Sequence, residues 1–281
     1  MSTHTTIAET VKSAAQRLDA LSESPRLDAE ILLSTILGLP RSALIARADE
    51  PLESDHQRAY AELIRQRAGG TPVAYLTGSR EFWSLPLRVS PAVLIPRPET
   101  ETLLEQALAL LPRDEACVVL DLGTGSGAIA LGLAHERPRW MITAVDLSPA
   151  ALDVARHNAK TLQLSIQWRL GSWFDAVPGE RFHLIAANPP YVSATDPALE
   201  SLSAEPLMAL SPGPTGLEAL AAIIAQAPEH LHPQGWLALE HGLTQAQDVA
   251  QLLMRHGFTS IRTFPDFSGR PRVTLGVHTQ H

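Results

Sequence analysis

The sequence predicts an α/β protein in which a seven-stranded, mostly parallel sheet follows a small helical bundle and a β-hairpin linker. After Pro112, short apolar runs alternate with helical segments, and such alternation implies right-handed βαβ units. Before residue 70, apolar residues recur at helical spacing instead. We therefore expect a helical domain at residues 1–72, a linker at 73–95 and the α/β domain at 96–281.

The helical domain should contain three helices. Apolar residues recur every three or four positions between Ile7 and Leu21 and again between Leu27 and Leu37. A third helix should run from about Asp55 to Ala68 and end at the following glycine pair. Such a bundle either stabilises the larger domain or grips a macromolecular substrate.

The linker pattern indicates two short strands around a turn at Ser84–Pro86. A helix should begin in the next segment, Leu94–Glu101, and continue to Leu111. Pro98 suits the first turn of this helix. The polar residues of this run either line a ligand pocket or cap the helix, and the sequence leaves both roles open. They are Arg97, Glu99, Thr100 and Glu101.

The larger domain should contain strands at 118–122, 141–145, 165–170, 182–187, 236–239, 259–264 and 272–277. Helices should lie at 128–135, at 148 or 149 to 160, at 216–229 and at 244–255. The proline-rich stretch from 192 to 214 is long for a connection without structure, which indicates a loop that contacts substrate.

Composition narrows the class of protein. The formal net charge of −8 weighs against a dedicated nucleic-acid reader, because phosphate neutralisation supplies most of such a protein's affinity. The single cysteine, Cys117, excludes intramolecular disulfides and indicates a reducing compartment. No apolar stretch reaches about 18 residues. We expect a cytoplasmic protein without a membrane partner.

A glycine-rich turn, Gly123–Gly127 with Thr124 and Ser126 between the glycines, follows the first strand of the sheet and opens a helix. Glycines let the backbone turn tightly and approach a ligand closely. By itself the run also fits a dinucleotide fingerprint. Asp121 precedes it by two residues, where it can meet a cationic amino-acid moiety, and this favours S-adenosylmethionine over a nicotinamide dinucleotide.

Two further residues belong to this predicted nucleoside site. Asp146 ends the second strand of the sheet, where it can accept both ribose hydroxyls, although either cofactor would use an acid there. Trp173 follows the third strand and either stacks on adenine or packs in the core.

The tetrapeptide Asn188-Pro189-Pro190-Tyr191 follows an apolar run, so it should lie at the carboxyl edge of the sheet, where open α/β sheets bind ligands. The prolines fix their own φ and push the preceding residues into extended geometry. This rigid segment can hold a planar amide or amine with hydrogen bonds and cover it with a ring. We expect methylation of nitrogen without a metal, since the histidines lack ligand spacing.

The glycine loop, Asp146 and the tetrapeptide together resemble class I methyltransferases that modify planar nitrogens. Further segments resemble the peptide chain release factor glutamine methyltransferases along nearly the whole chain. These segments are Pro72–Gly78, Glu81-Phe82, Leu94–Glu101, Glu205-Pro206, Ala209-Leu210, Gly216-Leu217 and Asp266–Arg272. One departure is His183, where this family usually carries an acid.

The resemblance implies a seven-stranded Rossmann-like methyltransferase sheet and methyl transfer to the glutamine N5 of the Gly-Gly-Gln motif in class I release factors, which modulates translation termination. It also implies that the glycine loop, Asp146, Trp173 and Asn188 contact S-adenosylmethionine, while Asn188–Tyr191 hold the glutamine. An N-methyltransferase of DNA or RNA, a nucleoside-binding protein without catalysis and a nicotinamide-dependent reductase are the alternatives.

Overall fold

The computed structural model describes residues 5–279, so the first four residues of the predicted helical domain and the last two of the α/β domain lie outside it. The chain forms two compact units, the first ending at Ser79 and the second beginning at Arg80. Among the described helices none is long and apolar enough to cross a membrane.

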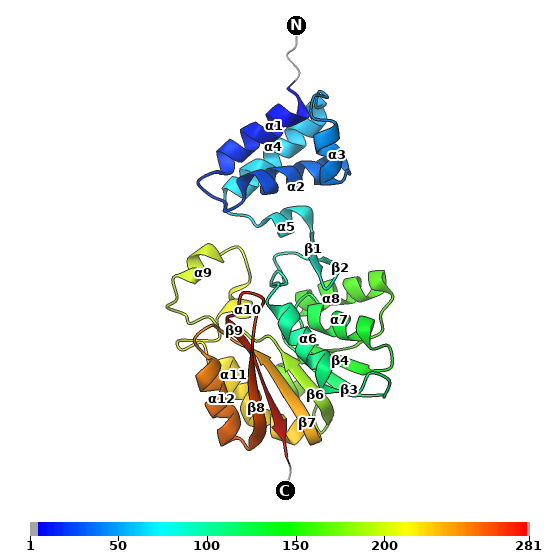
Figure 1. Cartoon of the computed structure of the whole chain (residues 1–281), viewed down its shortest axis with the longest axis vertical. Helices are drawn as coiled ribbons and strands as arrows, with labels where there is room; N and C mark the ends of the chain where they lie inside the picture. The colour runs from blue at the N-terminus through cyan, green and yellow to red at the C-terminus, as the bar shows by residue number, and fades with distance from the viewer. Residues whose placement is uncertain (1–4, 280–281) are drawn as a thin grey trace. The chain divides into compact units, whose positions relative to one another are not determined.

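The first unit is a helical bundle, drawn from blue to cyan in Figure 1. Its helices are α1 (Ile7–Leu18), α2 (Pro25–Leu37), α3 (Arg41–Ala46), α4 (Ser54–Ala68) and α5 (Val73–Thr77). A capping box begins α1, because the Thr6 hydroxyl accepts from the Glu9 amide while the Glu9 carboxylate accepts from the Thr6 amide. The apolar faces of α1, α2 and α4 enclose Leu18, Leu33 and Ile64, which are almost fully buried.

Two of these helices depart from the sequence prediction. Helix α3 was not predicted, and α5 occupies the beginning of the predicted linker. Pro72 precedes α5, and Gly78 ends it with a left-handed φ of 71°. A helix of five residues leaves too short a pattern for its periodicity to be recognised in the sequence.

The predicted hairpin is present as β1 (Ser79–Phe82) and β2 (Leu85–Arg88), but its turn comes earlier than expected. Trp83 and Ser84 form the turn with φ of 53° and 59°, the positive values of a type I′ turn. Tertiary hydrogen bonds hold Trp83 there. Its amide donates to Glu101 at 2.9 Å and its indole N–H donates to Glu136 at 2.8 Å.

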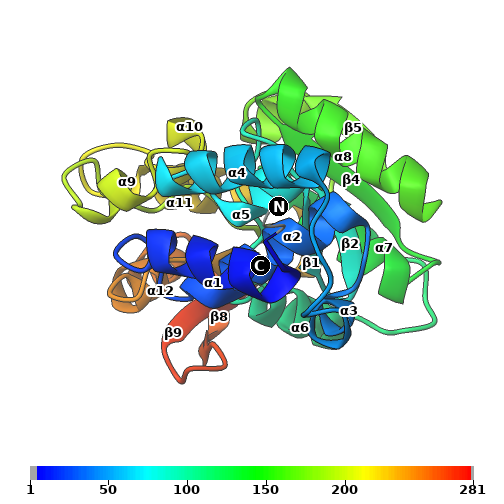
Figure 2. The ribbon, with the colours of Figure 1, turned by 90° about the horizontal axis from the view of Figure 1, so that it is seen from above.

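The second unit contains a seven-stranded sheet in the order β5-β4-β3-β6-β7-β9-β8. The strands are β3 (Val118–Leu122), β4 (Met141–Asp146), β5 (Gln167–Leu170), β6 (Phe182–Ala187), β7 (Leu231–Glu240), β8 (Phe258–Pro265) and β9 (Pro271–His278). Strands β3 to β7 pair in parallel, whereas β9 pairs antiparallel with both β7 and β8. Figure 2 shows β5 and the β8–β9 pair at opposite ends of this unit. The predicted mostly parallel sheet is confirmed.

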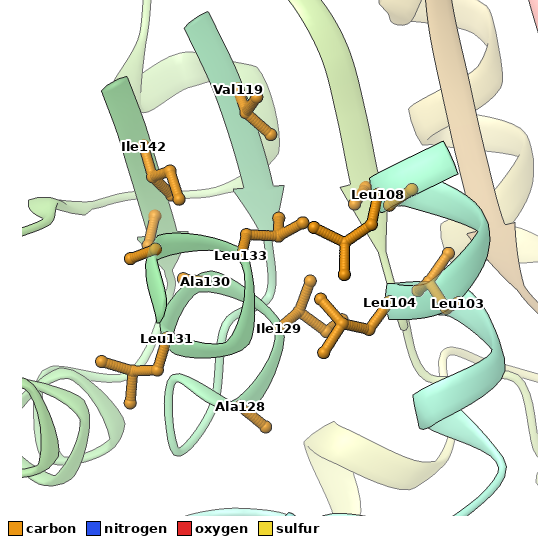
Figure 3. Packing of buried hydrophobic residues seen from close by; sticks show 14 of the residues in the cluster. Leu103, Leu104, Leu108, Val119, Ala128, Ile129, Ala130, Leu131, Leu133 and Ile142 are labelled. Carbon is orange, nitrogen blue, oxygen red and sulfur yellow. The ribbon is translucent and has the colours of Figure 1, made fainter. Parts of the chain in front are cut away.

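Helices cover both faces of the sheet. One face carries α6 (Thr100–Leu110), α7 (Ala128–Glu136) and α8 (Pro149–Leu162), and the other carries α11 (Glu218–Gln226) and α12 (Ala246–Arg255). Figure 3 shows α7 packed between the strands and α6, with Leu133 and Ile129 facing Leu104 and Leu108. Gly132 permits this approach, because a Cβ there would lie 2.4 Å from Leu104. The two faces therefore have separate apolar cores.

Several boundaries in the second unit differ from the prediction. Short helices α9 (Ala198–Ser201) and α10 (Leu207–Leu210) interrupt the proline-rich loop. One-turn 3₁₀ helices occupy Trp173–Ala176 and Ala227–His230. Strand β7 begins at Leu231 instead of residue 236, because Leu231 pairs with Phe182 of β6 before a register shift.

Candidate active site

A cavity of about 180 Å³ lies in the second unit at the carboxyl edge of the sheet, beside the ends of β3, β4 and β6. Most of the predicted site residues line it, namely Gly123, Thr124, Gly125, Ser126, Asp146, Trp173, Asn188 and Pro190. Gly127, Pro189 and Tyr191 are not among the lining residues. Gly127 directly precedes α7.

The glycine loop needs its glycines for conformation. Gly123, Gly125 and Gly127 have φ of 72°, 55° and 86°, which strain any residue with a Cβ. A Cβ at Gly127 would also lie 2.9 Å from the Leu131 side chain of α7. The loop therefore turns from β3 into α7 at three positions that carry no side chain.

Asp121 lies beneath this loop and not in the cavity, which corrects the expectation that it meets a cationic ligand group. Its carboxylate is fully buried and accepts from the Thr124 hydroxyl at 2.6 Å and from the Ala130 amide at 3.2 Å. Burial raises the pKa of Asp121 to about 7, although these two hydrogen bonds oppose the increase. Asp121 thus braces the loop against α7.

Asp146 lies in the cavity wall at the end of β4. One carboxylate oxygen accepts from the Gly125 amide at 2.8 Å and the other from the Ser148 amide at 2.8 Å. Burial raises the pKa of Asp146, while these amides favour its ionised form. Each oxygen keeps a further lone pair for a ligand hydroxyl. Ser148 caps α8, because its hydroxyl accepts from the Ala151 amide.

Trp173 lies between the cavity and the core, so stacking on adenine stays a prediction. Its ring lines the cavity and lies against Gly123, since a Cβ built there would be 3.4 Å from the ring. It also packs against the apolar core between the sheet and helices α11 and α12. Its φ of 44° is left-handed, a conformation that a bulky residue rarely adopts.

Asn188 leaves β6 with its carboxamide held by a neighbouring helix. Its Nδ2 donates to the Thr100 hydroxyl at 3.1 Å, so the amide oxygen remains free to accept. Thr100 is the first residue of α6 and lines the cavity, as does Arg97. Glu99 occupies the N-cap position of α6 but makes no side-chain capping hydrogen bond. Glu101 instead accepts from the Trp83 amide of the hairpin turn.

Tyr191 is anchored by residues that the sequence interpretation missed. Its hydroxyl donates to Glu240 at 3.1 Å, and its carbonyl accepts from the Gln245 side chain at 3.0 Å. Glu240 is fully buried at the end of β7. Burial raises its pKa to about 7, against the Tyr191 hydrogen bond and the influence of the Thr100 hydroxyl. Glu240 follows an apolar run, as Asn188 does, and that signal was available.

An ion pair joins two segments of the cavity wall. Arg97 and Glu205 pair at 2.5 Å, and the second Glu205 oxygen accepts from the Ile95 amide at 3.0 Å. The Glu205 side chain is only 3% exposed. The segment before α6 is thereby fastened to the proline-rich loop.

This fold and site define a class of enzyme, and comparisons with known proteins agree on it. A family model described as methyltransferase small domain matches residues 100–264, more than half of the chain. A methyltransferase from Pyrococcus furiosus has the same fold, with a TM-score of 0.54 at 17% identity over 70% of this chain and 90% of that chain. The second unit is a methyltransferase domain.

Relatives along the whole chain identify the family. The release factor glutamine methyltransferase of Coxiella burnetii is 44% identical over 96% of this chain and 98% of its own length. The enzyme of that name from Escherichia coli is 45% identical over the same shares. A model described as PrmC N-terminal domain matches residues 9–78. The chain belongs to the release factor glutamine methyltransferases, which confirms the resemblance found in the sequence.

Proposed function

We propose that this protein transfers a methyl group from S-adenosylmethionine to the N5 amide nitrogen of the glutamine in the Gly-Gly-Gln motif of class I release factors, and so modulates translation termination in the cytoplasm. The observation that carries this proposal is the Asn188 carboxamide in the cavity wall, oriented by Thr100. The names of relatives at 44% and 45% identity support this substrate over DNA or RNA.

The cavity fits S-adenosylmethionine through its chemistry. The backbone of Gly123–Gly127 turns without side chains in the way, so a ligand can approach it closely. We assign the ribose hydroxyls to Asp146, whose two oxygens keep free lone pairs, and the adenine to the neighbourhood of Trp173. Asn188 completes the cofactor side.

The tetrapeptide Asn188–Tyr191 is assigned to the glutamine. An amide nitrogen is a poor nucleophile, because its lone pair is delocalised into the carbonyl. The Asn188 side-chain oxygen and the Pro189 carbonyl would accept its two N–H groups and direct the nitrogen toward the methyl group. Bound S-adenosylmethionine supplies an electrophilic methyl whose leaving group is a neutral sulfide.

Alignment of this kind contributes several kcal/mol to catalysis, on the order of 7 or more in well-oriented systems. The same acceptors stabilise the positive charge that develops on nitrogen, and the proton leaves to solvent afterwards. Pro190 lines the cavity. We assign Tyr191 to packing against the glutamine side chain. No general acid is required in this scheme.

We further propose that the helical region, residues 1–72, recognises the protein substrate and that residues 73–95 link it to the methyltransferase region at 96–281. The test is mass spectrometry of a class I release factor after incubation with the enzyme and isotopically labelled cofactor, with DNA and ribosomal RNA in parallel reactions. A labelled methyl on the Gly-Gly-Gln glutamine is the expected result. Label on any other residue, or only on nucleic acid, would overturn the proposal.

Asn188→Ala provides the matched test of the site. It should abolish transfer, while calorimetry with S-adenosylmethionine shows that cofactor binding largely survives. Retained turnover in this variant would contradict the role of Asn188.

A further inference from the structure

Glu240 is a buried carboxylate beside the site that the proposed mechanism does not use. It directly follows Leu239, which pairs with Ala187 across β7 and β6, so Glu240 and Asn188 leave neighbouring strands at the same level. Its side chain is fully buried. One oxygen accepts from the Tyr191 hydroxyl, and the other makes no well-formed hydrogen bond among the described residues, although the Thr100 hydroxyl interacts with this carboxylate. A buried carboxylate without full pairing is costly, so its retention requires an explanation.

Thr100 connects Glu240 to Asn188. A hydroxyl carries one hydrogen, and the Thr100 oxygen already accepts from Asn188 Nδ2. Its own hydrogen therefore remains to be donated, and the buried Glu240 oxygen without a partner is the acceptor close by, because the Thr100 hydroxyl lowers the pKa of that carboxylate. An ionised carboxylate can only accept. With Glu240 ionised, the chain of hydrogen bonds runs in one direction, from Asn188 through Thr100 to Glu240.

The direction of this chain decides which atom Asn188 presents to the cavity. If Glu240 became a donor, the Thr100 hydrogen would be free to point at Asn188, and the carboxamide would gain by rotating its oxygen toward Thr100. The cavity would then receive the Asn188 NH₂ group. Two donors would face each other there, because the amide nitrogen of a glutamine also carries hydrogens.

We propose that Glu240 is a positioning residue for methyl transfer: its carboxylate holds Tyr191 directly and, through Thr100, keeps the oxygen of Asn188 directed at the acceptor nitrogen. This inference rests on the proposed function, because the acceptor nitrogen is that of the glutamine. Glu240 acts through Asn188 and Tyr191 and touches no reacting atom itself.

The surroundings of Glu240 make this arrangement sensitive to pH. Burial is the largest influence and raises its pKa to about 7, and the nearby Glu99 adds to the increase. The Thr100 and Tyr191 hydroxyls and the Arg272 guanidinium oppose it. Arg272 is in turn shared with Asp266, 3.6 Å away. The neighbouring His241 is occupied by Thr274 and by the Gly242 carbonyl. The hydrogen bonds from Asn188 through Thr100 to Glu240 should therefore lose their fixed donor-to-acceptor direction as the pH falls below about 7.

The experiment compares wild type with Glu240→Gln, which keeps the shape but offers a donor to Thr100. Single-turnover rates with saturating S-adenosylmethionine and a class I release factor are measured between pH 6 and 8.5. The wild-type rate should rise with pH through about 7. The Glu240→Gln enzyme should be slower at pH 8, by about tenfold to a hundredfold as expected for misplaced catalytic groups, and independent of pH. Its affinity for S-adenosylmethionine should remain within about twofold.

Thr100 supplies a second pair of variants. Thr100→Val removes the hydroxyl and should reproduce the slow, pH-independent rate, whereas Thr100→Ser keeps the hydroxyl and should recover the pH dependence. Glu229→Gln, an exposed residue of the same unit, is the control for loss of a carboxylate. If the Glu240→Gln enzyme retained the wild-type rate and pH profile, the inference would be wrong. A persisting acid limb would assign the titration to another group, such as Asp121.

A substrate-free measurement keeps this inference separate from the proposed function. The Asn188 side-chain amide resonances, identified by their loss in Asn188→Ala, should shift between pH 6 and 8 in wild type and stay fixed in Glu240→Gln. Absence of transfer to release factors by wild type would refute the proposed function alone. If the Asn188 resonances showed the same pH dependence in wild type and Glu240→Gln, the inference would be refuted, whatever the substrate proves to be.

Discussion

Asn158 ties three segments of the methyltransferase unit together, and its replacement should be among the most damaging changes distant from the cavity. Its side chain, 2% exposed on α8, accepts from the Arg88 amide at 2.8 Å. It donates to the Arg88 carbonyl at 3.0 Å and to the Ser126 carbonyl at 2.9 Å. One residue thus joins the hairpin, the glycine loop and α8.

Asn158→Leu keeps the number and branching of the side-chain heavy atoms and leaves three backbone groups without partners. A buried unsatisfied group costs about 1 to 3 kcal/mol. Assigning about 2 to the buried Ser126 carbonyl and about 1 to each partly exposed Arg88 group gives a loss of about 4 kcal/mol. Because the Ser126 carbonyl belongs to the glycine loop, affinity for S-adenosylmethionine should fall as well.

Urea unfolding followed by tryptophan fluorescence suits this test, because all five tryptophans lie in the second unit. His157→Ala is the control, since His157 is exposed on the same helix and should change stability by less than about 0.5 kcal/mol. A loss below about 1 kcal/mol in Asn158→Leu would show that water or a local shift satisfies the three groups, and the reasoning would fail.

Three other outcomes are expected. Gly216→Ala places a Cβ 2.4 Å from the Tyr191 carbonyl, whereas Gly179→Ala, at a similarly positive φ, places one in open space. Urea unfolding should therefore show at least about 2 kcal/mol more destabilisation for Gly216→Ala than for Gly179→Ala. Equal losses of stability would show that only the positive φ matters. Asp146→Ala should weaken S-adenosylmethionine binding more than about tenfold by calorimetry, whereas the exposed Asp153→Ala should not. The folded-state pKa of Glu240 is raised from 4.5 to about 7, so its stabilising contribution is lost as pH rises between these values. Denaturation of Glu240→Gln should therefore show a stability gain over wild type that grows by up to about 1.4 kcal/mol per pH unit in that window, and a pH-independent difference would contradict the raised pKa.

Much of the sheet could be predicted because its central strands carry continuous apolar runs. Strands β3 and β6 have the predicted bounds, since most of their residues are apolar and buried. Strand β7 was shortened in the prediction because Pro233 and Gly235 interrupt its apolar pattern. Pairing of Leu231 with β6 overrides that local signal, and such pairing depends on tertiary structure.

The site could be predicted where its residues follow a strand directly. Asp146 and Asn188 both reach the cavity wall for that reason. Asp121 was expected to meet a ligand in the cavity, but it lies beneath the glycine loop. Sequence spacing does not show that its carboxylate turns inward to Thr124 and Ala130. The connection from Asn188 through Thr100 spans 88 positions, and only the fold brings these two side chains together.

The pairing of Arg97 with Glu205 also constrains how this chain can diverge. Replacing either partner leaves the other charge unpaired, and for the buried Glu205 carboxylate that state costs several kcal/mol, on the order of 3 to 5. Loss of both charged residues avoids this cost, whereas loss of only one of them destabilises the protein. Substitutions at these two positions, 108 residues apart, should therefore occur together among related proteins.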